Sequence, residues 1–182
     1  MSPPRYAPSL LRLEPDPLPA AAPRPPVLII GVGNPARGDD AVGPLLLERL
    51  RTELLHQGPA AASAIELLDA YQLQPEHALD LRGRSRVIIA DATTAGPAPF
   101  ALSAVSPDPT PGFTTHSLSP AALAAVHQRL YGTAAPLWAL AIRGAHFGLG
   151  ERLSDAAAAN LDAALAWILA ELDLAARPTA SA

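Results

Sequence analysis

Acidic side chains gather directly after a short apolar stretch near the start of the chain. The stretch reads VLIIGVG, residues 27–33, and Asn34, Asp39 and Asp40 follow it closely. A further acid, Asp91, lies near the end of the apolar run RVIIADA. Carboxylates of this kind can bind a hard or borderline metal ion, or position and activate a water molecule. The chemistry therefore depends on whether these acids converge in the fold.

Histidine is a further residue type that could take part in such a site. His116 stands in the stretch TTHSLS, in a loop before a predicted helix. If the two apolar runs are neighbouring parallel strands, we expect Asp40, Asp91 and His116 to meet in one cleft, because ligands bind at the carboxyl ends of such strands. His146, in the segment after the last predicted strand, is a second candidate.

Each of these residues also has an ordinary structural alternative. One of Asp39 and Asp40 can cap the helix that follows, because a helix N-terminus favours negative charge. Asp91 can serve a turn or a cap at the end of its strand, and a loop histidine such as His116 is often simply solvated. Two adjacent acids nevertheless exceed what one cap requires.

The elements that must position these residues alternate along the chain. Apolar runs predict buried strands over residues 27–33, 64–70, 86–92, 98–104 and 136–142. Helical patterns cover about residues 40–56, 75–82, 118–131 and 154–173. Ser117 or Ser119 is expected to cap the third helix, and Ser154 precedes the fourth.

This order predicts an α/β fold with three layers, α/β/α, around a mostly parallel five-stranded twisted sheet. The run 98–104 follows the preceding strand after only a short link, so it is expected to be the one antiparallel strand, at an edge. We expect a single domain over residues 26–174. The proline-rich residues 1–25 are predicted to be a flexible extension and residues 175–182 a loose tail.

Composition narrows the possible functions. The net charge of −4 argues against a general affinity for nucleic acid or an anionic membrane. The absence of cysteine excludes disulfides, a thiol nucleophile and a thiolate metal site. No signal peptide or membrane-spanning run is evident, so we expect a cytoplasmic protein.

A dinucleotide-binding loop is one alternative for the first motif. Gly31, Gly33 and Ala36 satisfy the loose glycine fingerprint after a strand. Pro35, however, removes an amide that a phosphate would use, and two acids near the helix N-terminus oppose an anion there. We retain this alternative as the weakest.

Four separated motifs resemble the hydrogenase maturation proteases, the endopeptidases that trim the large subunit of nickel–iron hydrogenases. The motifs are GVGNPARGDDAVG, VIIADA, TTHSLS and the segment from Phe147 to Ser154. They occur in the family's order and spacing across about residues 27–170. The segment AYQLQPEH stands where many members have a Gly-Gly-Thr turn, and it is similar to a variant found in some of them.

The resemblance implies a function and a site. Asp40, Asp91 and His116 would contact a nickel ion already loaded in the precursor subunit, and cleavage would remove its C-terminal extension. The metal would thus be carried by the substrate rather than bound permanently. Asp40 or Asp91 would double as general base, as in the aspartic-type peptidases with which the family is classed. The family resemblance assigns supporting roles to Gly31, Gly33, Asn34 and Asp39.

The partner implied is the hydrogenase large-subunit precursor, and we expect the protein to be a monomer. One alternative from another class stays open: a non-catalytic maturation chaperone for the metal or the subunit, built on the same fold.

Overall fold

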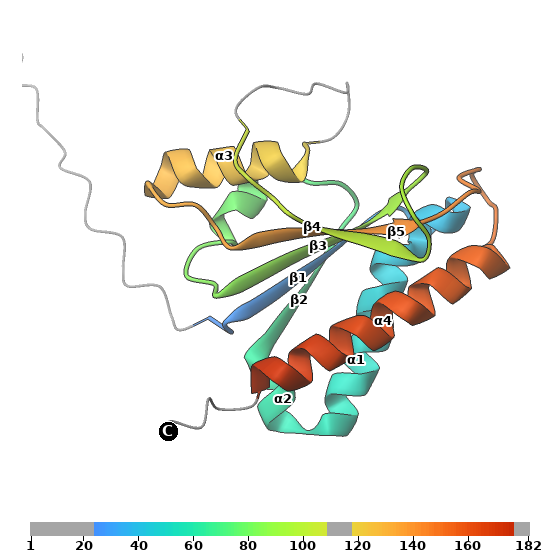
Figure 1. Ribbon diagram of the computed structural model, residues 1–182, viewed down its shortest axis with the longest axis horizontal. Helices are drawn as coiled ribbons and strands as arrows, with labels where there is room; N and C mark the ends of the chain where they lie inside the picture. Colours follow the sequence, from blue (N-terminus) through green and yellow to red (C-terminus); the bar gives the residue numbers. More distant parts are fainter. Residues whose placement is uncertain (1–23, 109–117, 177–182) are drawn as a thin grey trace, which may run out of the picture.

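The computed structural model describes residues 24–108 and 118–176 and contains a single five-stranded sheet (Figure 1). The strands are β1 (Val27–Val32), β2 (Ile65–Ala70), β3 (Arg86–Thr93), β4 (Phe100–Ala104) and β5 (Leu137–Arg143). Their order in the sheet is β2-β1-β3-β5-β4, in which every pairing is parallel except β4 with β5. The predicted antiparallel edge strand is confirmed. β1 and β3 are neighbours, which is the condition on which the expected convergence of Asp40 and Asp91 depends.

Helices cover both faces of this sheet. The helical elements are η1 (Gly38–Ala41), α1 (Val42–Gln57), α2 (Pro59–Ala64), η2 (Pro75–Leu79), α3 (Pro120–Tyr131) and α4 (Asp155–Ala176), with η1 and η2 being 3-10 turns. Figure 1 shows α1 and α4 below the sheet and α3 above it. The three-layer α/β/α prediction is therefore confirmed.

Two apolar clusters fill the spaces between the layers. The first joins the sheet to α1 and α4 through residues such as Ile29, Leu46 and Leu161. The second joins the opposite face to α3 and η2 through residues such as Ile30 and Leu123. The alternation of Ile29 and Ile30 between the two clusters follows from the two-residue period of a strand. Both faces of β1 are buried, which explains its uninterrupted apolar sequence.

Three local predictions need correction. The helix expected over 75–82 is a shorter 3-10 turn, and α2 was not expected at all. The first long helix begins at Val42 rather than at residue 40, because residues 38–41 form the separate turn η1.

Two serines cap helices at positions where caps were expected. Ser119 caps α3 by accepting a hydrogen bond from the Ala122 amide at 3.1 Å. Ser154 caps α4 through the Ala157 amide at 3.1 Å.

The strand order fixes where a ligand site can form. The chain passes from β1 to β2 on one side and then returns to β3 on the other side of β1. Crevices open at such a reversal, beyond the carboxyl ends of the two central strands. Within the described residues, no helix is long and apolar enough to cross a membrane.

Candidate functional site

The segment after β1 turns back tightly and lies against its own helix. Gly33 has φ of 141°, and a Cβ atom built there would lie 1.9 Å from the backbone oxygen of Asp40. A Cβ on Gly31 would likewise lie 2.6 Å from the Gly43 oxygen. The two predicted site glycines therefore let β1 and the start of α1 approach closely. A contact between them and a substrate stays a prediction.

Asp40 lies in η1, at the rim beyond β1, and is partly exposed. Its Oδ2 accepts a hydrogen bond from the backbone amide of Asn34 at 2.9 Å. Asn34 is buried, and its side chain accepts from the Ala36 amide at 2.9 Å and donates to the hydroxyl of Tyr71. Asn34 therefore helps to hold the carboxylate of Asp40, and its supporting role in a catalytic site stays a prediction.

Asp91 lies at the carboxyl end of β3, next to β1 in the sheet. Its Oδ1 accepts from the Ala92 amide at 2.8 Å. Burial is the main cause that raises the pKa of Asp91 to about 6, and the hydrogen bond from Ala92 opposes it. The negative charge of Asp40 raises this pKa further, so the two carboxylates lie within electrostatic reach of each other. The fold thus brings together two of the three residues expected in the cleft.

Asp39, the residue before Asp40, has no exposed surface. Its carboxylate accepts from the amides of Ala145 and His146 at 2.8 and 2.9 Å. It also accepts from the Ser154 amide at 2.8 Å and from the Ser154 hydroxyl at 2.9 Å. Burial acts to raise the pKa of Asp39, but these hydrogen bonds together lower it. Neither η1 nor α1 has a side-chain cap, so Asp39 and Asp40 do not play the capping role weighed as the alternative.

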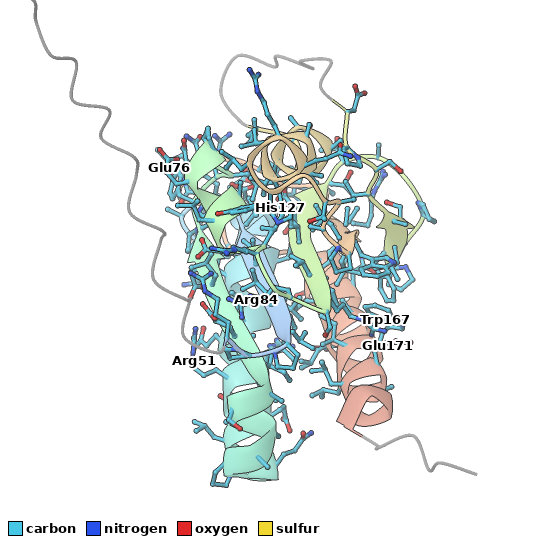
Figure 2. The ribbon with its side chains drawn as sticks, turned by 90° about the vertical axis from the view of Figure 1, so that its left-hand side faces the viewer. Arg51, Glu76, Arg84, His127, Trp167 and Glu171 are labelled. Atoms are coloured by element: carbon cyan, nitrogen blue, oxygen red, sulfur yellow. The ribbon has the colours of Figure 1, made fainter. Side chains whose placement is uncertain are left out.

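The histidines lie in different environments. His116 lies outside the described residues, so its approach to Asp40 and Asp91 stays a prediction. His146 is exposed in the loop after β5, and its carbonyl accepts from the Asp39 amide at 2.7 Å. His127 is buried on the inner side of α3, with Nδ1 3.1 Å from the Thr133 oxygen (Figure 2). His77 accepts from the Gln74 amide within η2.

Sequence reasoning missed two features of this rim. Tyr71, two-thirds exposed, lies just after β2 and bonds to Asn34. It borders a hollow of about 450 Å³ that is lined by Asp69, Ala70, Tyr71, Gln72, Gln74 and His77. Its position directly after a strand was the available signal. Ser154 was expected near a helix start, but its bonds to Asp39 join segments that are 115 residues apart, which no local pattern indicates.

The Asp40–Asp91 pair favours a cation over an anion. Two nearby carboxylates repel each other, and an ion with positive charge relieves that repulsion. Oxygen ligands with one imidazole suit borderline divalent metals. Among residues 24–108 and 118–176, no group of three His, Cys, Asp or Glu could hold a metal ion. The described residues therefore supply two carboxylates for a cation, and any third ligand must come from outside these residues.

Comparisons with known proteins support the fold assignment. No family model matches the chain, and no curated protein does. Solved structures do match. The NiFe hydrogenase maturation protease HycI from Thermococcus kodakarensis is 22% identical with a TM-score of 0.64, over 82% of this chain and 94% of that one.

Two further structures agree with this match. The hydrogenase maturating endopeptidase HybD from E. coli is 24% identical with a TM-score of 0.60, over 82% of this chain and 93% of that one. An uncharacterized protein from Wolinella succinogenes is 25% identical with a TM-score of 0.53, over 83% of this chain and 98% of that one. The chain therefore has the fold seen in hydrogenase maturation proteases, and the resemblance noted in the sequence is confirmed at that level.

Proposed function

We propose that this protein is an endopeptidase that removes the C-terminal extension of a nickel-loaded nickel–iron hydrogenase large-subunit precursor. The observation that carries the proposal is the Asp40–Asp91 pair at the rim between β1 and β3, on a fold shared with such proteases. The pair occurs at the two positions that the sequence motifs single out.

Recognition would depend on charge. A precursor that carries nickel offers the two carboxylates a compensating charge, whereas an empty precursor leaves them repelling each other. Asp40 and Asp91 would contact the ion, and His116 would supply an imidazole ligand from the loop before α3. The nickel belongs to the substrate in this scheme, so the protein needs no resident metal.

The chemical step would use one of the same acids as a base. The substrate's metal can polarise the scissile carbonyl, which makes attack by water easier. Asp91 is the better candidate base, because its raised pKa of about 6 brings it near the operating pH while leaving it mostly ionised at pH 7. Asp40, with one oxygen on the Asn34 amide, would mainly hold the ion.

The geometry opposes the dinucleotide alternative. In a phosphate-binding loop, the amides after the strand must be available to the anion. Here the Asn34 amide donates to the Asp40 carboxylate, so an internal negative charge already occupies that position. Asp69, near the end of β2 where a ribose-binding acid would be expected, pairs with Arg51 at 3.2 Å.

In-vitro processing tests the proposal directly. The purified protein is mixed with nickel-loaded and with nickel-free precursor, and shortening of the precursor is followed on a gel. We expect cleavage only of the loaded form, and none with Asp40→Ala, Asp91→Ala or His116→Ala. Normal processing by all three variants would refute the assigned site. Binding of loaded precursor without any shortening would instead favour the chaperone alternative.

A further inference from the structure

Three consecutive backbone amides join the two segments that carry the candidate acids. The Gly144 amide donates to the Thr93 oxygen at 2.9 Å, at the end of β3, two residues after Asp91. The next two amides, of Ala145 and His146, donate to Asp39, the residue before Asp40. The segment Gly144–His146, which we name the bridge, therefore links the end of β3 to η1. In Figure 1 the orange loop that follows β5 lies beside the pale blue segment before α1.

Asp39 holds its side of the bridge by several independent bonds. Its carboxylate accepts hydrogen bonds from the two bridge amides and from the amide and the hydroxyl of Ser154. Its own amide donates to the His146 oxygen at 2.7 Å. A buried carboxylate is costly unless donors surround it, and here they do. An uncharged side chain could not accept all of these bonds, so an acid is required at this position for a reason separate from metal binding.

The close approach also depends on a glycine in the bridge. A Cβ atom on Gly144 would lie 2.8 Å from the Cβ of Asp39 and 3.0 Å from the Phe147 ring. Any side chain there would push η1 away from the end of β3. The bridge is therefore built for one spacing between these two segments.

We propose that Asp39 is a positioning residue that sets the separation of Asp40 and Asp91 through the Gly144–His146 bridge. The inference rests on the proposed function for its effect on catalysis, but its structural part can be tested without it. Asp39 itself contacts neither the substrate nor the metal in this scheme. Its effect arises because it fixes the turn η1, which presents Asp40 to Asp91.

The Asn34 amide reports the position of Asp40 without any activity measurement. This amide donates to Asp40 Oδ2, and no bond joins Asn34 to Asp39 among the described residues. In Asp39→Asn we expect the Asn34 amide resonance to shift and its hydrogen exchange to accelerate. An Asn34 amide that stays unchanged while the Ala145 and His146 amides lose protection would overturn the inference.

Glu66→Gln is the matched control. Glu66 accepts a hydrogen bond from the buried Arg84 guanidinium at 2.5 Å. It lies near the amino end of β2, whereas the candidate acids lie at or beyond the carboxyl ends of β1 and β3. The variant makes the same acid-to-amide change at a partner of a buried group. It is expected to lower thermal stability without moving the Asn34 amide.

Turnover of nickel-loaded precursor completes the test, at a temperature where every variant is folded. We expect Asp39→Asn to lower kcat about a hundredfold, because misplacing a catalytic group by about an ångström has an effect of that size. We also expect KM to rise, because Asp40 holds the ion of the substrate in the proposed function. Glu66→Gln should keep the wild-type kcat. Wild-type kcat in folded Asp39→Asn would overturn the inference, whereas no cleavage by the wild type would refute the proposed function alone.

Two further variants keep the inference falsifiable if Asp39→Asn does not fold. Ser154→Ala removes one donor to Asp39 and leaves the bridge amides in place. Gly144→Ala keeps every donor but displaces Asp39. Each must shift the Asn34 amide in the same direction and lower kcat, and failure of either folded variant to do so overturns the inference.

Discussion

Asp91 should weaken the fold at neutral pH, and replacing it should strengthen the fold. The pKa of Asp91 is raised from 3.8 to about 6, first by burial and then by the charge of Asp40. A group whose folded pKa is raised favours folding fully below its unfolded pKa, and the benefit is lost as the pH rises through the folded pKa. The relevant window therefore lies between about pH 4 and pH 6.

The size of the effect follows from the shift. About two pKa units at 1.36 kcal/mol each correspond to about 3 kcal/mol of free energy of unfolding. Asp91 is partly exposed, so solvent screening makes this an upper limit. Asp91→Asn removes the charge while its amide oxygen can still accept from Ala92. We expect it to be more stable than wild type at pH 8 by up to about 3 kcal/mol, or about 6–12 °C in Tm.

Thermal unfolding followed by circular dichroism from pH 4 to pH 8 measures this difference. The gain should shrink as the pH falls to about 4, because folded Asp91 is then protonated and only the unfolded state is still partly ionised; it should vanish below about pH 3, where Asp91 is neutral in both states. Asp69→Asn is the control: it is the same change at an exposed acid of the same rim, and we expect less than about 0.5 kcal/mol at any pH. An Asp91→Asn protein that is no more stable than wild type at pH 8 would refute the reasoning.

Three further predictions concern catalysis and the backbone. The rate of precursor cleavage should fall as the pH drops below about 6, because Asp91 then gains a proton and can neither accept one nor face a cation; a flat profile between pH 8 and pH 5 would contradict this. Gly33→Ala should lower the free energy of unfolding in urea by more than about 3 kcal/mol, since its new Cβ would strike the Asp40 backbone oxygen. Gly58→Ala should lower it by about 1 kcal/mol, because Gly58 has a positive φ but open space around it. Ser119→Ala should cost about 1 kcal/mol by the same measurement, because the Ala122 amide loses its cap; an unchanged midpoint would refute the capping role.

Much of the fold could be predicted because its signals are local. The unbroken apolar runs around Ile29 and Ile88 require burial on both faces. The short link before residue 98 leaves no room for a crossover helix, which favours an antiparallel strand, although β4 pairs with β5 and not with β3, the strand it follows. The reversal of strand order beside β1 places the ends of β1 and β3 next to each other, and the approach of Asp40 to Asp91 follows from it.

What could not be predicted depends on contacts between distant segments. Asp39 and Asp40 are adjacent and have the same side chain. Asp39 is buried and accepts hydrogen bonds from Ser154 and from the loop after β5, whereas Asp40 is partly exposed at the rim and accepts from the Asn34 amide. The direction of each side chain depends on how residues 38–41 tighten into a 3-10 turn rather than a first turn of α1. No periodicity in the sequence distinguishes these two outcomes.

The backbone bonds of the two rim acids limit what the site can hold. Asp40 gives one oxygen to the Asn34 amide, and Asp91 gives one to the Ala92 amide. Each acid therefore has a single oxygen left that no bond from the described residues occupies. These amide bonds leave the other oxygen of each acid as the favoured ligand, and two such oxygens are far fewer than the coordination shell of a divalent ion requires, so a hydrated ion has little reason to shed its water here. We expect these two acids to contact a metal ion whose other ligands are supplied by another protein, and not to bind a free metal ion from solution or store one.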